Sequence, residues 1–433
     1  MNKSFDEIFE YVKTLEVFDT HEHIELPSDY DGPRDVLADW LAHYLSSDFI
    51  SAGMTGAQMD RVRDAKLPLM ERYAIAEPYF DVCRYTGYGQ AIDLSAKLLY
   101  DIDGVHRETV EAIDEKRKAA FADTAAHYRR ALRDGCNIAV SVVDTLRHSG
   151  EYDRAVVLEH GLWFATKIDC LLCPEQDGAV AFHAAERRFG RIDTLNRWLE
   201  ICEVYLREAA ARGIPGLKVA RAYARDIYFR DAPKSDADEC FRKLAENIHA
   251  GRLYAQWYTD CEDYILHHIL GIADELGLAV QIHTGMQEGN VHDIRATDPR
   301  KLTNLILKYR NVKFDIFHIG FPYHDALTAM AKKYHNVFID MCWAHIISPD
   351  VSRRALGEWL ESVPYNKIFG FGGDYIFVDG VPGHLYIARR NIAKTLAEKV
   401  GEGLFSIDRA ADIAKAILYD NPAKVFNWRN QRV

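Results

Sequence analysis

The sequence predicts an α/β protein, namely a (β/α)8 TIM-type barrel with a helical insertion after its first strand. Eight short apolar runs alternate with helix-like segments, which is the order that gives a parallel sheet closed by crossover helices. Polar side chains that bind metals or move protons follow several of these runs, where barrel enzymes place their active sites. Such a barrel needs roughly 250 residues, so much of this 433-residue chain must lie in insertions.

The apolar runs give the predicted strands in chain order. A helix over residues 4–15 leads into the first strand, and a helix rich in Glu, Lys, Arg and Ala over 107–134 precedes the second. The eight predicted strands cover residues 17–24, 137–144, 167–172, 216–221, 278–285, 312–318, 336–341 and 367–374. Further helices are predicted at 191–212, 235–249, 258–276, 299–310, 324–334, 352–361, 384–400 and 408–419.

One long irregular segment, residues 26–104, follows the first predicted strand and contains helix-like pieces at 35–47, 57–75 and 91–100. Connections of this length inside a compact domain are typically functional loops or small subdomains. No low-complexity linker or internal repeat divides the sequence. We therefore predict a single domain over residues 1–433, with 26–104 as a helical insertion or lid.

Composition limits the classes of partner. The formal net charge of −12 argues against nucleic acid or an anionic membrane, because both favour clustered Lys and Arg, so a small molecule is expected. The N-terminus lacks the apolar core of a signal peptide, and no apolar stretch has the length of a membrane span. Most of the eight cysteines lie inside apolar runs, as free thiols do in a reducing compartment. We expect a cytoplasmic protein and, from precedent, a homo-oligomer.

The first strand carries the strongest chemical signal, a pair of histidines two residues apart. In a β-strand, residues i and i+2 point to the same face, so His21 and His23 can direct both imidazoles at one point while Glu22 faces away. Imidazole is a ligand for zinc, iron and nickel. A lone H-x-H pair is a weak signal among 18 histidines, but its place at the end of the first strand favours a metal site.

Four further polar residues lie in or directly after other predicted strands: Lys218, His283, His318 and Asp374. Each has an ordinary structural explanation. His283 and His318 can be hydrogen-bonded core histidines, and Asp374 can cap the turn that follows it. Lys218 is costly to bury without a partner, and it fits either a carbamate that bridges two metals or a substrate contact. Together with the histidine pair, these residues predict a metal site at one end of the barrel.

The motifs of this chain resemble those of the metal-dependent amidohydrolase superfamily, in particular its amidohydrolase-2 branch. The middle of the chain is similar to the amidohydrolase domain of FluG and nodulin-type proteins, and the insertion is similar to that of uronate isomerases. The resemblance implies that His21, His23 and Asp374 hold a divalent metal, commonly zinc, as one or two ions. It further implies His283 as a ligand, and His318 as a second-metal ligand or substrate contact. The motifs are DTHEH at 19–23, VQIHTG at 280–285, HIGFPYH at 318–324, GGD at 372–374 and DNPA at 420–423.

The chemistry of these residues predicts a hydrolase. A divalent ion with an open position lowers the pKa of bound water towards about 7, and Asp374 can accept the proton and pass it to a leaving group. His318 or Lys218 can polarise the carbonyl oxygen of the substrate. The same residues also suit aldose–ketose isomerisation or decarboxylation. A third alternative is a catalytically inactive scaffold, which would purify without stoichiometric metal.

Substrate-binding residues are predicted just beyond the strands. Arg221, Tyr223 and Arg225 follow the fourth strand and can bind a carboxylate, although a solvated loop explains these charges equally well. His324, Trp343 and His345 also follow strand ends and are predicted to line the pocket. The substrate itself and the number of metals stay open at this point.

Overall fold

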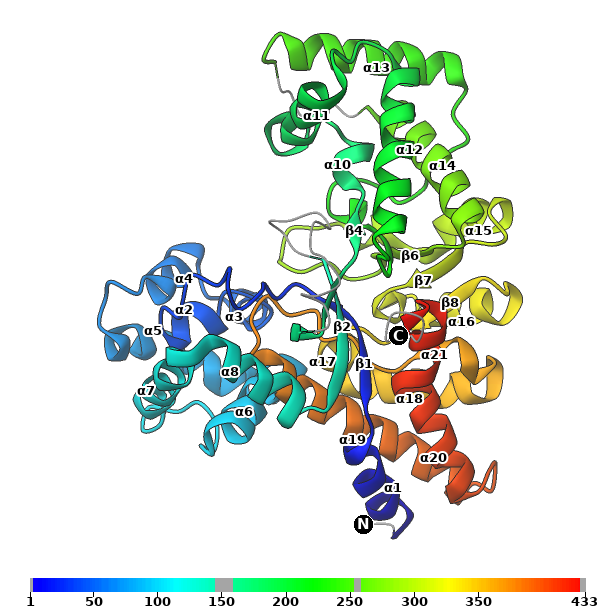
Figure 1. The fold of residues 1–433 in the computed structure, drawn as a ribbon. Helices are drawn as coiled ribbons and strands as arrows, with labels where there is room; N and C mark the ends of the chain where they lie inside the picture. The colour runs from blue at the N-terminus through cyan, green and yellow to red at the C-terminus, as the bar shows by residue number, and fades with distance from the viewer. Residues whose placement is uncertain (1–2, 145–158, 253–257, 429–433) are drawn as a thin grey trace.

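The computed structural model of the chain describes residues 3–144, 159–252 and 258–428. It confirms an α/β fold whose paired strands are all parallel (Figure 1). The strands form two runs of neighbours, in the order β1-β2-β3 and β4-β5-β6-β7-β8-β9. Their bounds are β1 Val17–Glu22, β2 Ile138–Val143, β3 Leu162–Phe164, β4 Thr166–Lys167, β5 Gly216–Val219, β6 Ala279–Ile282, β7 Lys313–Ile316, β8 Val337–Asp340 and β9 Ile368–Phe369.

Backbone contacts join the two runs of strands into a ring. On one side, β3 and β4 are separated by Ala165 alone, so they act as one bent barrel strand. On the other side, Thr20 N donates to Phe371 O at 3.1 Å and Asp374 N donates to His21 O at 2.8 Å, which ties β1 to the segment after β9. The ring therefore has eight strand positions, and its closing contacts lie beside the predicted metal ligands.

The third predicted strand, 167–172, is wrong in its position. The strand residues come earlier, at 162–167, and Asp169–Leu172 forms a short helix, α10. Leu171 N and Leu172 N both donate to Ile168 O, and the Asp169 carboxylate accepts a hydrogen bond from Ala220 N at 3.0 Å. A short apolar run suits a buried helical turn as well as a strand, so its apolarity could not separate the two.

The segment between β1 and β2, which lies wholly within the described residues, contains helices and no strand. Its helices gather on one side of the strands (Figure 1), and α6 packs against α19, the helix that follows β9. The predicted helix 57–75 is two helices, because Pro68 lies directly before the second of them and starts it. The helices are α2 Val36–Trp40, α3 Leu45–Ser51, α4 Gly56–Arg63, α5 Leu69–Cys83, α6 Gly87–Tyr100, α7 Val110–Ala120 and α8 Thr124–Tyr128, followed by a π-helical turn over Arg129–Asp134.

A second group of helices, α10 to α14, projects from the other side of the strands (Figure 1). Its centre is α12, of which one face is buried: Trp198, Cys202 and Leu206 are all fully enclosed. Thr194 caps this helix by accepting from Arg197 N at 3.3 Å. The bounds are α11 Gln176–Phe189, α12 Leu195–Ala211, α13 Lys234–His249 and α14 Thr259–Leu276.

The remaining helices surround the barrel. They are α1 Lys3–Thr14, α15 Thr303–Lys308, α16 His324–Lys333, α17 Ala344–Ile347, α18 Pro349–Ser362, α19 Gly380–Gly401, α20 Ile407–Lys415 and α21 Asn421–Val425. Phe426, just after α21, stacks on Phe18 of β1 with ring centroids 5.6 Å apart. Within the described ranges, no helix has both the length and the apolar character needed to cross a bilayer.

A buried ion cluster joins the first group of helices to the start of α19. Asp379 precedes α19, and its two carboxylate oxygens lie 2.6 Å from Arg117 Nε and 2.6 Å from His127 Nε2. Trp40 Nε1 donates to the same carboxylate at 3.1 Å. Burial alone would raise the pKa of Asp379, but Arg117 and His127 outweigh it and lower the pKa to about 2.

This pKa predicts an acid-sensitive contribution to stability. Because the folded pKa lies below the unfolded value of about 3.8, the ionised Asp379 stabilises the fold above pH 4, and this contribution is lost as pH falls through 2. The full contribution is about 2 kcal/mol. We expect Asp379→Asn to be less stable than wild type at pH 5, with the gap narrowing by about 1 kcal/mol at pH 3. Urea unfolding at both pH values measures it, and an unchanged gap would contradict the assignment.

Candidate metal centre

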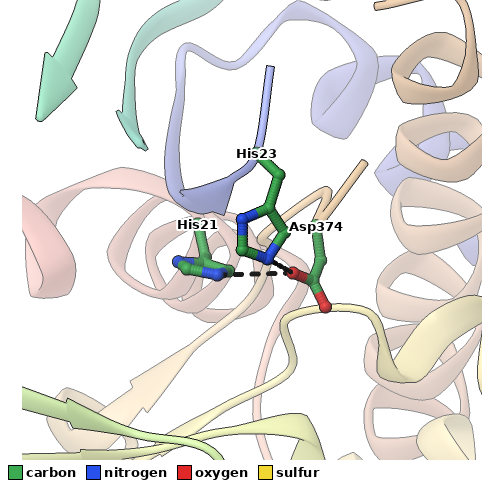
Figure 2. Close-up of side chains that lie close together, drawn as sticks. All are labelled: His21, His23 and Asp374. Atoms are coloured by element: carbon green, nitrogen blue, oxygen red, sulfur yellow. Dashed lines mark ion pairs between the residues drawn. The ribbon is translucent and has the colours of Figure 1, made fainter. Parts of the chain in front are cut away.

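The side chains of His21, His23 and Asp374 converge on one point (Figure 2). Asp374 Oδ1 lies 3.3 Å from His21 Nε2 and 3.2 Å from His23 Nε2. His21 is completely enclosed, whereas 19% of the His23 side chain is exposed. One nitrogen from each imidazole and one carboxylate oxygen therefore lie together, in a group of ligand atoms that all fall within 4.8 Å of one another.

The backbone of β1 and of the segment after β9 holds this geometry. The register between β1 and β2 shifts between Asp19 and Glu22, so the strand is irregular where the histidines lie. Glu22 is fully buried, and its carboxylate accepts a hydrogen bond from Tyr375 N at 2.7 Å. A Cβ at Gly373 would lie 1.8 Å from Glu22 Oε1, so a larger residue directly before Asp374 would displace the buried Glu22 carboxylate.

Non-glycine residues in the left-handed backbone region gather at this end of the barrel. His318, Trp343 and Asp374 have φ values of 61°, 59° and 60° and follow β7, β8 and β9 respectively. This conformation costs of order 1 kcal/mol or more for a residue with a side chain, and it persists where the surroundings over-determine it. Its repetition after three neighbouring strands is typical of a functional site.

Two more histidines extend the group. His318 Nε2 lies 3.9 Å from Asp374 Oδ2 and 3.1 Å from His283 Nδ1. Because a carbonyl oxygen only accepts, His318 Nδ1 carries the proton that it donates to Cys342 O, and His283 Nε2 carries the proton that it donates to Met286 O. The lone pairs of His318 Nε2 and His283 Nδ1 therefore face each other, an arrangement that a cation or a shared proton stabilises.

The same logic sets the tautomer of His23. Its Nδ1 donates to Asp144 O at 2.6 Å, so Nε2, which lies 3.2 Å from Asp374 Oδ1, is the nitrogen left to bind a metal ion or to donate to Asp374. A hydrogen bond from the far ring nitrogen to a carbonyl is the support that metal-binding histidines characteristically have. His21 Nδ1 is buried and has no hydrogen-bond partner among the described residues.

Burial keeps most of the imidazoles neutral, as metal binding requires. It lowers the pKa of His318 to about 4, and together with the nearby Lys218 it lowers the pKa of His21 and His283 well below the usual value. For Asp374, burial would raise the pKa, but the hydrogen bond from His23 and the histidine charges hold it well below its usual range. The site therefore offers neutral nitrogen donors from His21, His283 and His318 and an ionised carboxylate. At His23, burial lowers the imidazole pKa, but the hydrogen bond to Asp374 outweighs it and raises the pKa above the usual value.

Lys218 completes the cluster. Its Nζ lies 3.3 Å from His21 Nε2 and 3.7 Å from the ring centroid of Phe317. Burial lowers the pKa of Lys218. The negative charges of Asp144 and Asp374 raise it, but their effect is smaller. An amine that loses its proton more readily is a better nucleophile and metal ligand than an ordinary surface lysine.

The donor set fits a divalent metal ion. Imidazole nitrogens with a carboxylate are the ligands of catalytic zinc and of related first-row ions. The ligand atoms that would hold the ion are His21 Nε2, His23 Nε2 and an oxygen of Asp374, with His283 and His318 adjacent. The ligand atoms of a second group, His318, Cys342 and Asp374, also lie within 4.8 Å of one another. The cluster therefore offers two overlapping candidate positions for a metal ion.

The predicted substrate-binding residues lie in different environments. Arg221 and Arg225 are both paired with Glu262, at 3.0 and 3.3 Å, so internal carboxylates already hold the two guanidinium groups. Tyr223 packs against His283, with ring centroids 4.6 Å apart. Trp343 packs edge-on against His318 at 5.1 Å. His324 starts α16 and pairs with Asp325, and no described contact ties it to the cluster.

Three further residues at the site were missed by sequence reasoning. His43 and Tyr44 lie between α2 and α3: burial lowers the pKa of His43 to about 3, and Tyr44 Oη donates to Asp374 O at 2.5 Å. Asp144 ends the β2 run, and both of its carboxylate oxygens are buried without a hydrogen-bond partner in the described chain. Its position directly after an apolar strand was the available signal. No sequence pattern marked His43 or Tyr44, because they come from the insertion.

A comparison with protein families identifies the family of the chain. A model of the amidohydrolase family matches residues 38–428. The chain belongs to the amidohydrolase family. The match begins after β1, so it includes His283, His318 and Asp374 and leaves His21 and His23 outside it.

A curated relative supports the same assignment. The amidohydrolase chain is 22% identical over 230 residues to protein fluG of Emericella nidulans, which covers 50% of this chain and 26% of that protein. The chain therefore spans about a quarter of the relative's length. The FluG resemblance expected from the motifs is confirmed.

Solved structures share the fold of this amidohydrolase along nearly its whole length. Uronate isomerase from Thermotoga maritima has a TM-score of 0.79 at 16% identity, over 98% of both chains. Glucuronate isomerase from Caulobacter crescentus has a TM-score of 0.76 at 18% identity, over 98% of this chain and 94% of that one. A Lactobacillus casei protein named as a metal-dependent hydrolase has a TM-score of 0.67 at 15% identity, over 98% of both. At these identities the comparison establishes the fold.

Proposed function

We propose that the chain is a metal-dependent hydrolase that cleaves a C–N or C–O bond at a carbonyl of a small, carboxylate-bearing substrate. The observation that carries the proposal is the convergence of His21, His23 and Asp374 at the carboxyl ends of two barrel strands. Membership of the amidohydrolase family supports it. The cytoplasmic location and the homo-oligomeric state expected from the sequence stay predictions.

We infer that the metal is zinc, as one or two ions. His21, His23 and Asp374 would hold the first, with His283 as a further ligand. When bound, such an ion supplies Lewis-acid chemistry, activating water near neutral pH and polarising a carbonyl group.

The protein's own groups supply the proton transfers and the orientation. Asp374 is ionised, so its carboxylate can take a proton from the attacking water and deliver it to the leaving group. Lys218 is placed to polarise or hold the carbonyl oxygen of the substrate, and His318 can do so once Nε2 is protonated, because its Nδ1 proton is already donated to Cys342 O. Arg221, Tyr223, Arg225, His324 and Trp343 are retained as candidate substrate-binding residues. For the two arginines, this role requires a substrate carboxylate to compete with Glu262.

Isomerisation of a uronic acid is the second candidate. It is favoured by the likeness to two uronate isomerases over at least 94% of each chain, a span that includes the helical insertion. In that reaction the hydrogen on C2 moves to C1 and the proton on O2 moves to O1 of one substrate, and Asp374 would carry a proton between these positions. No water would be consumed.

Mass spectrometry in oxygen-18-labelled water separates the two candidates. The zinc-loaded protein is incubated with N-acyl amino acids, lactones bearing a carboxylate, glucuronate and galacturonate, and the metal-stripped protein is the control. We expect one panel member to gain one labelled water in the loaded sample alone. A product of unchanged mass from a uronate would instead establish the isomerase. A protein that binds no metal after reconstitution would overturn both candidates and favour the scaffold alternative.

A further inference from the structure

The six residues from Asp374 to Asp379 connect the candidate metal ligand to α19. At its first residue, this segment is tied to β1 and to the insertion. Asp374 N donates to His21 O at 2.8 Å, and Tyr44 Oη donates to Asp374 O at 2.5 Å. These contacts hold the backbone of Asp374 from two sides.

At its last residue, the same segment is held by side chains from three helices that lie between β1 and β2; α2 belongs to the 26–104 insertion, and α7 and α8 follow it. Asp379 accepts hydrogen bonds from Trp40 of α2 and Arg117 of α7, and it pairs with His127 of α8. The Arg117 guanidinium reaches a second carboxylate, with NH2 2.8 Å from Asp39 Oδ2. The side chains of Arg117, His127 and Asp379 are fully enclosed. No bulk water competes for these contacts, so they are electrostatically stronger than the same contacts at the surface.

The contacts of Asp379 with Trp40, Arg117 and His127 form the anchor of this segment. The anchor affects the metal centre through the backbone conformation of Asp374. Asp374 has a φ of 60°, in the left-handed region, which costs energy for a residue with a side chain and which aspartate enters more readily than most. A segment held at one end alone can relax this torsion and move the carboxylate away from His21 and His23. Holding both ends prevents that movement.

We propose that Trp40, Arg117 and His127 are positioning residues for Asp374, and that the insertion is a fixed wall of the metal centre instead of a movable lid. The inference rests on the proposed function in one respect, that Asp374 binds the metal. The three residues act on Asp374 through Asp379 and have no role in contacting substrate.

Two variants test the proposal with graded severity. Arg117→Lys keeps the positive charge but cannot contact Asp379 and Asp39 with one planar group. Trp40→Phe keeps a buried aromatic ring and removes the N–H that reaches Asp379. If Arg117→Lys fails to fold, Trp40→Phe still tests the anchor.

The matched control is a buried ion pair that lies within the 26–104 insertion. Arg72 of α5 contacts Asp35 at 2.7 and 3.1 Å. The exposed fractions of these two side chains are 2% and 6%, close to those of the fully enclosed Arg117 and Asp379. Neither residue has a described contact with the 374–379 segment. Arg72→Lys therefore lowers the stability of the insertion without releasing Asp379.

Three readouts are compared after cobalt(II) substitution: the visible absorption spectrum, the cobalt dissociation constant, and amide hydrogen exchange of the peptide that covers 374–379. We expect both anchor variants to alter the spectrum, to weaken cobalt binding by about 10- to 100-fold, and to speed exchange in that peptide. Arg72→Lys is expected to lower the melting temperature and leave all three unchanged. A purely structural role would give the anchor variants the same result as this control.

The outcomes separate the two proposals. Folded anchor variants with the wild-type spectrum, affinity and exchange would overturn the positioning role. A wild-type protein that binds no cobalt would overturn the metal centre of the proposed function. In that event the exchange of the 374–379 peptide still decides whether Trp40 and Arg117 hold the segment.

Discussion

Replacing His21 and His23 together by alanine is expected to remove the bound metal and abolish turnover. Wild type purified without added metal should contain about one or two equivalents, because imidazole and carboxylate donors converge within binding distance. The variant retains Asp374 but loses both nitrogen donors at the end of β1. Elemental analysis of both proteins, with activity measured on the same samples, provides the test. Two equivalents in wild type would favour a carboxylated Lys218.

A matched control separates metal loss from general damage. His345 is also completely buried, but its Nε2 faces Gly370 O at 3.1 Å and has no described contact with the cluster. His345→Ala should lose stability and keep its metal. Retention of metal by the folded double variant would refute the assignment of these two ligands.

Asp374→Asn is expected to lower kcat by about 10²- to 10⁴-fold, the usual contribution of a positioned acid or base. The asparagine keeps the size of the side chain and one oxygen, but it cannot accept and return a proton. Since part of the loss can arise from weaker metal binding, kcat is measured at saturating zinc with the metal content verified. Asp374 alone links the metal group to the proton transfers, so its replacement should affect both metal affinity and kcat.

The control for this variant is a carboxylate outside the site. Asp350 in α18 is mostly exposed and pairs with two surface arginines, so Asp350→Asn should leave kcat within about twofold. A kcat for metal-loaded Asp374→Asn within about threefold of wild type would exclude the proton-transfer role, while the carboxylate could still be a ligand.

Seven of the eight predicted strands lie where the sequence placed them, because fully buried parallel strands are continuous apolar runs with polar residues after them. The third prediction was wrong because an apolar run indicates burial in a helix as well as in a strand. The run at 168–172 is equally apolar, but it packs as a helical turn, and the strand residues at 162–167 precede it. Apolarity predicts burial and does not by itself predict backbone conformation.

The grouping of His21, His23, His283, His318, Lys218 and Asp374 followed from the sequence once a parallel barrel was assumed. Parallel strands end at the same edge, so residues that follow different strands must meet there. The distances of 3.1 to 3.9 Å among these side chains agree with that grouping. Their catalytic and metal-binding roles stay predictions that the experiments above test.

The tertiary structure alone decided what surrounds that group. It paired Arg221 and Arg225 with Glu262, and it brought His43 and Tyr44 of the insertion to Asp374. These contacts join residues separated by tens to hundreds of positions, and no local periodicity encodes them. The sequence by itself determined the barrel and the chemistry at its edge, because both depend on patterns within single strands. The anchoring of the insertion depends on side chains from separate helices meeting in space, which only the folded chain specifies.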